Sequence, residues 1–579
     1  MRLRTLHERF KMIDFSYRRL QSISASLFFI IGITPYFVFT FFNVDPLHDG
    51  WFSSPATAIA QGGVPYRDVV TSYGWFTPAF LAAIIKIFGF QLLYFRLVGL
   101  ILFLGICLLC VLLVRKSFGL NRALVVVSVW LLIGLGHLTK DPQALPAWGL
   151  WPNQFIIFST LLLIYLLLRP NNFSYFTLTT IGLIAGLTPW VRAQGILIFA
   201  SSLFVFSVRI YQSSDSVKPR KILYLFSVSF LIFSAPFLYL HLNDAIDEWF
   251  WQTIEMPRSG EWVGMPDPTV WLVQNFGLAI VLTLGLFFVS FVLGLLKISS
   301  KKTILVLAPV LALVSVFPVS KAPLDESVIL KKVHSLVFLY SNYYFFTLPV
   351  LIILTATLFL MFRILRMTLI TRGSNLVEMP TLVAILGIPP LALVYYNFGH
   401  LWGVAPLLFL SVLYFWKQNR EFTLRFSQFR QVVVLYSILV SLIAVPQIYS
   451  NLAKPTFTYS ASGLVGMKGQ DPQQVLETQK AIRSLSHLPN GSLVFFLCEN
   501  AFYSTIQGRY LSDNSFYSTS MTIFDLRSPE NRSPSTETKF VVYCPGSNTM
   551  PIEQLPGNWA LLDFNGNLPS AGLQIYERK

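Results

Sequence analysis

The sequence predicts an all-α polytopic membrane protein with about 13 transmembrane helices, followed by a small C-terminal extracytoplasmic α/β domain. Hydrophobic residues make up 54% of the 579 residues and charged residues only 12%, whereas soluble domains carry about a quarter charged residues. Apolar segments of about twenty residues recur, and each is long enough to cross a bilayer as a helix. Every second loop is basic, as the positive-inside rule requires.

The first apolar segment follows a basic N-terminal stretch and is not followed by a small-residue cleavage site, so we expect a retained span with the N-terminus in the cytoplasm. The later segments have the same length and composition. The expected helices cover residues 20–42, 91–114, 122–138, 153–168, 174–189, 193–210, 222–241, 269–296, 303–320, 343–364, 379–397, 401–416 and 431–450.

The acidic residues of the membrane part are concentrated in the loops opposite the basic ones. Acidic residues contribute little to topology, so their clustering indicates a working face on the outer side. The net charge of +16 is spread over short basic loops, without a basic aromatic-rich domain. This distribution argues against nucleic-acid binding and favours contact with anionic lipid head groups.

Residues 451–579 differ from the multi-spanning domain of residues 1–450. A polar helix is expected at 471–488, and the apolar runs 493–497 and 540–543 predict buried strands of a small α/β domain. An odd number of spans precedes this domain, so we expect it on the outer side of the membrane. Cys498 and Cys544 follow the two strands, and a disulfide between them is one of two open alternatives.

The first outer loop, residues 43–90, is long for a membrane protein, and long loops are usually functional. It is also organised. A short helix at 56–60 is stopped by Gly62-Gly63, and an amphipathic helix at 78–88 is stopped by Gly89. We expect both helices to lie flat at the membrane surface.

The motifs of this loop resemble those of the GT-C membrane glycosyltransferases, mainly over residues 20–120. The branch most resembled contains the protein O-mannosyltransferases and the lipid A aminoarabinose transferases. The matching motifs, in order, are His48-Asp49-Gly50, Ala56 to Ala60, Gly62-Gly63-Val64-Pro65-Tyr66-Arg67-Asp68, Tyr73-Gly74-Trp75-Phe76-Thr77-Pro78 and Phe88-Gly89.

The resemblance implies a GT-C-like fold and transfer of a sugar from a polyprenyl-phosphate carrier, with inversion, to an acceptor on the outer face. By position, Asp49 is then the general base. The family often has an acidic pair where this chain has Asp49-Gly50, and a glutamate where it has Tyr73-Gly74.

The chemistry independently favours a carboxylate here, because an acceptor hydroxyl must lose its proton as it attacks the anomeric carbon. Asp49 is the first candidate and Asp45 the second. The alternative for Asp49 is a solvated turn or a helix cap. Asp45, His48 and Asp49 could also hold Mg²⁺ or Mn²⁺, but the sequence assigns no metal ligand.

The leaving phosphate needs cationic or hydrogen-bonding groups near the interface. The candidates are Arg67, Lys140, Arg192, His334 and His400. Arg192, between two apolar segments, either binds phosphate or reaches the interface as a snorkelling side chain. His400 has a structural alternative, and Lys140 has an alternative as a surface ion pair with Asp141.

Substrate contacts are expected from His48, Asp68, Tyr73 and Trp251. Aromatic faces beside carboxylates suit sugar rings, although tryptophans also gather at membrane interfaces. The expected partners are a polyprenyl-phosphate sugar, an envelope glycan, lipid or protein acceptor, and membrane lipids. The expected location is a bacterial-type inner membrane.

A multi-pass transporter of a lipid-linked or small-molecule substrate is the competing hypothesis. Such a protein should show repeated halves and ionisable groups near the bilayer midplane. The sequence shows no halved repeat, and its acidic residues cluster in outer loops. A non-catalytic envelope scaffold is a third possibility, and it would leave the Asp49 region dispensable.

Overall fold

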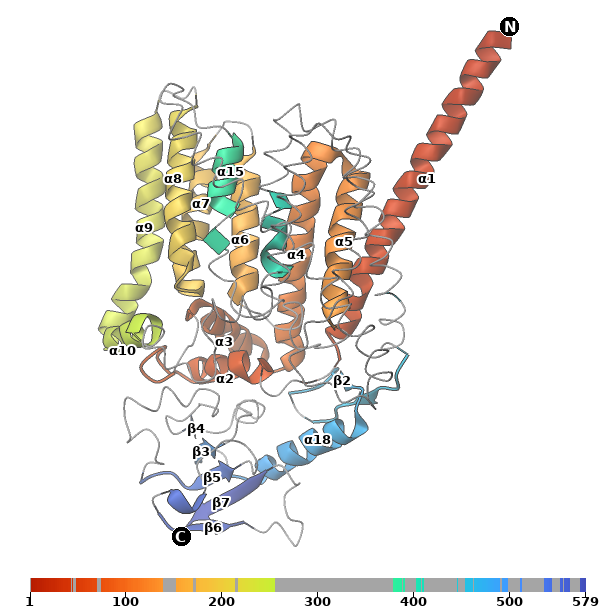
Figure 1. Ribbon diagram of the computed structural model, residues 1–579. Helices are drawn as coiled ribbons and strands as arrows, with labels where there is room; N and C mark the ends of the chain where they lie inside the picture. Colours follow the sequence, from red (N-terminus) through yellow and green to blue (C-terminus); the bar gives the residue numbers. More distant parts are fainter. Residues whose placement is uncertain are drawn as a thin grey trace, which may run out of the picture.

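The computed structural model is a helical bundle with a small domain at one end (Figure 1). It describes residues 2–42, 44, 48–69, 74–138, 152–169, 173–213, 217–255, 379–387, 389–390, 402–407, 409–410, 445, 453–461, 463–489, 492–497, 511–512, 536–543, 552–555, 557–562 and 573–579.

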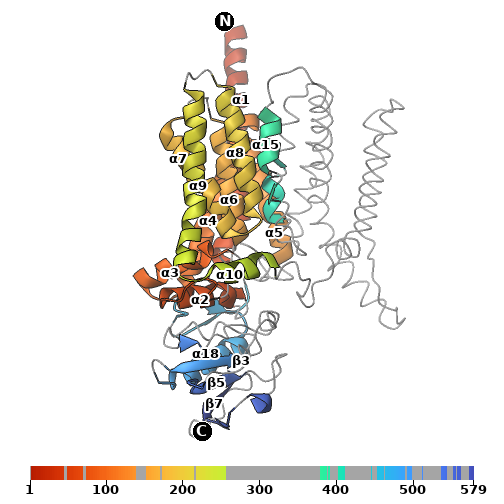
Figure 2. The same ribbon diagram turned by 90° about the vertical axis from the view of Figure 1, so that its left-hand side faces the viewer.

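The described part of the bundle consists of long apolar helices that run alongside one another (Figures 1 and 2). They are α1 (Arg2–Phe39), α4 (Leu92–Phe118), α5 (Leu120–Leu138), α6 (Pro152–Leu167), α7 (Tyr175–Val191), α8 (Gly195–Tyr211), α9 (Lys218–Leu242) and the shorter α15 (Met379–Gly387). The helices α4 to α9 begin and end within a few residues of the expected spans. The spans expected at 269–296, 303–320 and 343–364 lie outside the described residues, as do most of 431–450 and parts of 379–397 and 401–416.

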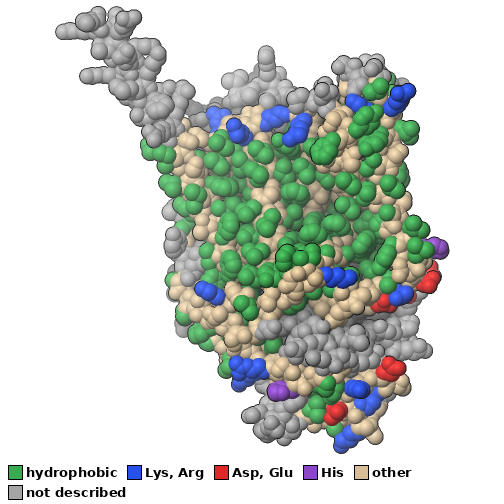
Figure 3. All heavy atoms as spheres, turned by 180° about the vertical axis from the view of Figure 1, so that it is seen from behind, with side chains coloured by type: hydrophobic (Ala, Val, Ile, Leu, Met, Phe, Trp, Pro, Cys, Tyr) green, Lys and Arg blue, Asp and Glu red, His purple; other side chains and the backbone are tan. Residues whose placement is uncertain are grey.

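The surface of the bundle is suited to a bilayer, and the protein is an integral membrane protein. Helices long and apolar enough to cross a membrane occur at Leu20–Phe39, Leu92–Phe118 and Lys218–Leu242 among the described residues. A broad band of hydrophobic side chains covers the face seen in Figure 3. Basic and acidic side chains both occur along its lower edge, whereas lysine and arginine gather along its upper edge. We call that edge the basic end; its residues include Arg115, Lys116, Arg122, Arg209, Lys218 and Arg220.

Two short helices cross the opposite end of the bundle. They are α2 (His48–Ala60) and α3 (Phe76–Phe88), and we call this end the loop end (Figure 1). Gly89 has a φ of 77°, a conformation that glycine adopts without strain, and its N–H closes the last turn of α3. The surface helices expected in the first outer loop are therefore present. The segments α10 (Ile246–Phe250) and η2 (Trp251–Glu255) follow α9 at the same end.

The C-terminal part contains the expected helix and both expected strands. The helix α18 (Pro472–Ser486) is capped by the Asp471 side chain. A five-stranded sheet has the order β4-β3-β5-β7-β6, in which β3 and β5 are parallel neighbours and β7 is antiparallel to β5 and β6. The strands are β3 (Leu493–Leu497), β4 (Leu511–Ser512), β5 (Phe540–Tyr543), β6 (Trp559–Leu561) and β7 (Gln574–Arg578), and a separate hairpin joins β1 (Phe457–Thr458) to β2 (Lys468–Gly469).

The C-terminal part is attached at the loop end. The Lys468 N–H donates to the carbonyl of Phe41 at 2.8 Å, and the Leu92 N–H donates to that of Gly463 at 3.0 Å. Val44 and Leu92 belong to the hydrophobic core of this part. These contacts hold residues on both sides of the first outer loop, so the loop and the C-terminal part lie on the same side of the bundle.

The bundle core contains a tight aromatic contact between distant parts of the chain. Trp130 and Trp402 stack with ring centroids 4.6 Å apart, and each indole N–H donates to the other residue's carbonyl, at 2.9 and 2.7 Å. Tyr36 of α1 lies parallel to the Trp402 ring and donates to the Leu131 carbonyl at 2.7 Å. Gly134 of α5 leaves the space that these rings fill.

Replacing Gly134 with Ala should lower the thermal stability, because the new Cβ would lie 2.5 Å from Trp402 ring atoms and the Tyr36 hydroxyl. Overpacking of this kind costs about 1–3 kcal/mol. The control is Gly32→Ala on α1, whose Cβ would meet its nearest neighbours at 3.5 Å, an ordinary contact distance. Thermal unfolding of the purified variants measures both, and equal unfolding temperatures would contradict the packing described.

Candidate functional site

The central feature of the loop end is a buried ion pair between Asp49 and Arg96. Asp49 lies in the first turn of α2, and Arg96 lies near the start of α4. The Arg96 Nη2 atom donates to Asp49 Oδ2 at 2.6 Å, and Nε approaches Oδ1 at 3.4 Å. The two residues are 8% and 1% exposed. A guanidinium and a carboxylate that meet edge to edge form a directional, charge-assisted contact.

Arg96 also joins this pair to the end of α1. Its Nη1 atom donates to the carbonyl of Phe42 at 2.7 Å and to that of Thr40 at 3.5 Å. Phe42 in turn forms a β-bridge with Lys468 of the C-terminal part. One arginine therefore links three segments: the end of α1, the first turn of α2, and α4.

The position of Asp49 excludes one of its two structural alternatives. Its side chain is buried and paired, so it is not part of a solvated turn. It does lie at the N-terminus of a helix, where the helix dipole favours a negative charge. Arg96 was not among the residues expected from the sequence. The available signal was a lone arginine near the start of an otherwise apolar span, a costly placement that usually marks a partner or a function.

Arg67 and Asp68 are bonded to each other at the loop end. The Arg67 Nε and Nη2 atoms donate to the two oxygens of Asp68 at 2.8 and 2.9 Å, and Nη1 donates to the Asn243 carbonyl at 3.0 Å. Asp68 also accepts the Val64 N–H at 2.8 Å. The pair closes the turn at residues 64–69 and fastens it to the end of α9. Hydrogen bonds from Arg67 hold the pKa of Asp68 below its ordinary value of 3.8.

Gly74 lies directly against the end of α7. The Gly74 N–H donates to the Val191 carbonyl at 3.0 Å, and a Cβ at this position would overlap the carbonyl of Trp190. No side chain fits there, so the chain approaches the end of α7 closely only because residue 74 is glycine. Tyr73 itself lies outside the described residues.

Arg192 is buried where α7 ends, at 8% exposure. Its guanidinium donates to the Asn153 side-chain oxygen at the start of α6, and its Nε donates to the Gln194 side-chain oxygen at 3.1 Å. Asn153 and Gln194 are neutral amides. Arg192 therefore joins α6 to the α7–α8 turn, and its guanidinium is inside the protein rather than extended into solvent.

The other expected site residues are placed only in part. Trp251 is partly buried in η2 at the loop end. His48 begins α2, but its side chain is not among those described. The remaining expected residues lie outside the described part of the chain: Asp45, Lys140, His334, His400 and the cysteines Cys498 and Cys544.

Within the described ranges, no cluster of three His, Cys, Asp or Glu side chains could hold a metal ion. Asp49 and Asp68 each already bond to an arginine guanidinium. The positive charge of that guanidinium would repel a metal cation at the same carboxylate. Of the residues considered for Mg²⁺ or Mn²⁺ from the sequence, Asp45 and the His48 side chain lie outside the described residues, so that site stays a prediction.

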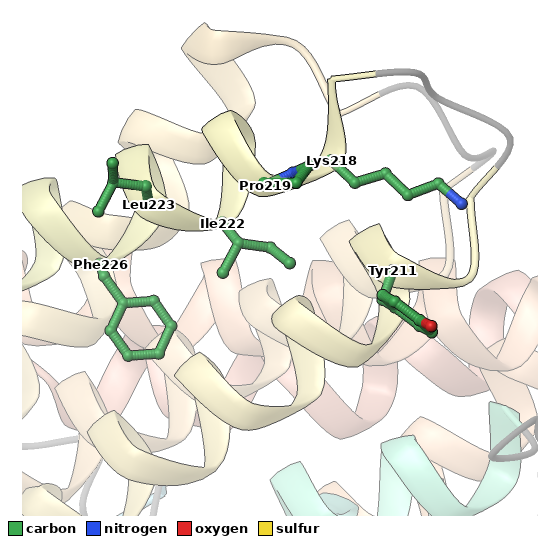
Figure 4. Close-up of a pocket in the computed structure, with 6 residues that line it drawn as sticks. All are labelled: Tyr211, Lys218, Pro219, Ile222, Leu223 and Phe226. Carbon is green, nitrogen blue, oxygen red and sulfur yellow. The ribbon is translucent and has the colours of Figure 1, made fainter.

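A shallow apolar groove lies between α8 and α9, at the basic end (Figure 4). It is lined by Tyr211, Lys218, Pro219, Ile222, Leu223 and Phe226. Because this groove is at the opposite end of the bundle from Asp49, we do not assign it to the site.

Comparisons with known proteins return structural neighbours but no sequence relatives. The chain is similar to crystal structures of ArnT, a GT-C lipid A aminoarabinose transferase, from Cupriavidus metallidurans, one bound to undecaprenyl phosphate and one in the apo state. Both have 12% sequence identity and a TM-score of 0.42, with coverage of 96% and 95% of this chain and 98% and 97% of theirs. No family model matches the sequence, and no curated protein matches it.

Replacing Arg96 with Gln should strongly destabilise the protein, because Asp49 would keep a buried charge without its guanidinium partner. Losing one member of a buried ion pair costs about 3–5 kcal/mol. The matched control is Arg67→Gln, which removes an exposed arginine from a similar contact and should change the unfolding temperature little. An equal loss of thermal stability in both variants would contradict the central role of the buried pair.

The turn at residues 64–69 should loosen in acid. Because the folded-state pKa of Asp68 is lowered, the pair with Arg67 contributes its full stability above about pH 3.8 and loses it as the pH falls further. Hydrogen exchange of this turn at pH 5 and at pH 3 measures the effect. In Asp68→Asn the turn should be loose at both pH values, and a turn that stays equally protected in the wild type would refute the expectation.

Proposed function

We propose that this protein is an inverting glycosyltransferase that moves a sugar from a polyprenyl-phosphate carrier to an envelope acceptor on the outer face of the membrane. The observation that supports it best is the buried Asp49–Arg96 pair at the loop end. A carboxylate is held there in a fixed orientation, where the membrane-spanning helices meet the first outer loop.

The reaction is a single displacement at the anomeric carbon. The acceptor hydroxyl gives its proton to Asp49 as its oxygen forms the new bond to that carbon. On the opposite face of the sugar, the bond from the carbon to the phosphate oxygen breaks. The polyprenyl phosphate leaves with the bonding electrons and needs no proton, because it is stable as an anion.

Arg96 acts as a positioning residue in this scheme. Its two contacts with the carboxylate fix the side-chain rotation of Asp49, and its contacts with the carbonyls of Phe42 and Thr40 fix the guanidinium. A base held in this way is aligned before the acceptor arrives, which lowers the entropic part of the barrier. Asp45 remains the second candidate for the base.

Arg192 is the residue that we assign to the donor phosphate. Its guanidinium is buried at the loop end, and arginine often binds phosphate through two parallel hydrogen bonds. Arg67, by contrast, we assign to the turn that it closes with Asp68. Lys140, His334 and His400 remain further candidates for the phosphate, and His48, Tyr73 and Trp251 remain candidates for substrate contacts.

The proposed orientation follows from the charge distribution. The basic end faces the cytoplasm under the positive-inside rule, so the loop end and the attached C-terminal part face outward. We propose a bacterial-type inner membrane as the location. The transporter alternative predicts movement of a lipid-linked substrate without a new glycosidic bond, so envelope analysis discriminates between the two.

Replacing Asp49 with Asn should abolish transfer by removing the base. The experiment compares envelope glycans and lipids, by mass spectrometry, between cells that lack the protein and cells that express each variant. Cells with Asp49→Asn should match the cells that lack the protein.

The buried pair requires a control for folding, since Asp49→Asn leaves the charge of Arg96 uncompensated. The double variant Asp49→Asn with Arg96→Gln removes both charges together, so it should recover stability but not activity. Full transfer by a stably expressed Asp49→Asn protein, or by the double variant, would reject Asp49 as the base.

A further inference from the structure

The groove between α8 and α9 is not used by the proposed site. Its lining comes from the last residue of α8, Tyr211, and from one face of the start of α9. The α9 residues Pro219, Ile222, Leu223 and Phe226 are three or four positions apart, so they form a single stripe along the helix. The lining is almost wholly apolar, and the groove has a volume of about 560 Å³. Such a surface suits a hydrocarbon chain rather than a polar solute.

The groove is open to the outside of the bundle. The helix α9 is long and apolar enough to cross a membrane, and it lies at the left edge of the bundle in Figure 1. Tyr211 and Leu223, which line the groove, are 71% and 69% exposed. Exposed apolar surface on a membrane-spanning helix meets lipid rather than water, so lipid chains have access to the groove.

Lys218 places a positive charge at one end of this apolar surface. Its ammonium nitrogen lies 5.7 Å from the centroid of the Tyr211 ring, a cation–π contact that keeps the side chain beside the groove. Figure 4 shows Lys218 next to Tyr211, whereas Leu223 and Phe226 lie at the other side. An ammonium above an apolar stripe complements a molecule with a phosphate at one end and a hydrocarbon chain at the other.

The sequence around Lys218 is positively charged on balance. The connection from α8 to α9 contains one acidic residue, Asp215, whereas the basic residues nearby are Arg209, Lys218, Arg220 and Lys221. The positive-inside rule accounts for basic residues at this end of the bundle, but it does not require an apolar groove beside them. Basic pockets between membrane-spanning helices bind anionic lipid head groups, so the two features together indicate a lipid site.

The length of the groove agrees with the depth of one leaflet. Residues 218–226 of α9 extend about 12 Å along the helix axis, and the hydrocarbon of one leaflet is about 15 Å deep. Because Lys218 lies at the basic end of the bundle, Phe226 lies deeper in the membrane. A phospholipid presents its charged group and its acyl chains in the same order.

We infer that the α8–α9 groove binds an anionic phospholipid of the surrounding membrane, with its phosphate at Lys218 and one acyl chain along Leu223 and Phe226. Phosphatidylglycerol has a suitable head group, because it carries no amine. The ammonium of phosphatidylcholine would offset part of the attraction to Lys218. The inference does not depend on the proposed function, in which the donor phosphate is assigned to the loop end.

The test compares phosphatidylglycerol and phosphatidylcholine with the same acyl chains, bound to the purified full-length protein and measured by native mass spectrometry. The wild type should bind phosphatidylglycerol more tightly. Lys218→Gln should weaken that binding about fivefold, the effect of one basic residue beside an anionic lipid, and leave the affinity for phosphatidylcholine unchanged. The matched control is Arg115→Gln, which removes an exposed basic residue at the same end of the bundle but outside the groove and should change neither affinity.

Photo-crosslinking tests the location of the lipid in the wild type, so it does not depend on the folding of a variant. The probe is a phosphatidylglycerol with a photoreactive diazirine in its acyl chain, in vesicles that contain the protein. It should label residues 211–226 in preference to the other apolar helices. The same labelling should fall in Lys218→Gln and persist in Arg115→Gln.

Three results would overturn the inference. They are equal affinities of the wild type for the two lipids, an equal loss of phosphatidylglycerol binding in Lys218→Gln and Arg115→Gln, and labelling spread evenly over the apolar helices. Complete displacement of the photoreactive lipid by an equal amount of undecaprenyl phosphate would also overturn it, in favour of a site for the carrier lipid.

Discussion

The loop end depends on the requirement that two opposite charges, removed from water, stay in contact. Neither Asp49 nor Arg96 is stable alone in an apolar environment, since each would lose its hydration without compensation. The pairing therefore fixes where α2 begins relative to α4. The carbonyls of Phe42 and Thr40 extend this constraint to the end of α1. This contact therefore fixes the first turn of α2 against the end of α1 and the start of α4.

The two arginine–aspartate pairs differ in burial, and burial determines how much each pair contributes to stability. Arg67 and Asp68 are adjacent in sequence and exposed, so water competes for their contacts and the pair adds little stability. Asp49 and Arg96 are distant in sequence and buried, so their contact is costly to break. The residue types are the same, but only the second pair is removed from solvent.

Local patterns in the sequence were sufficient to predict the apolar helices, the surface helices of the first loop, α18, and strands β3 and β5. Each of these follows from periodicity, composition or a glycine stop within a short window. The hydrogen-bond partners of the candidate site residues could not be predicted from such short windows. Asp49 meets Arg96, 47 positions away, and Arg192 meets Asn153, 39 positions away, only because separate helices are packed together. The need for glycine at position 74 likewise comes from a distant segment, because the end of α7 leaves no room there for a side chain.

The attachment of the C-terminal part affects what a truncated form of this protein would retain. Lys468 bonds to Phe41, just before the first outer loop, and Gly463 bonds to Leu92, just after it. One short stretch of the C-terminal part therefore anchors both ends of the loop. Removing that stretch would release both ends of the loop and increase the conformational freedom of residues 43–90. A truncated protein without residues 451–579 would therefore lose this anchoring although every residue of the proposed site is still present.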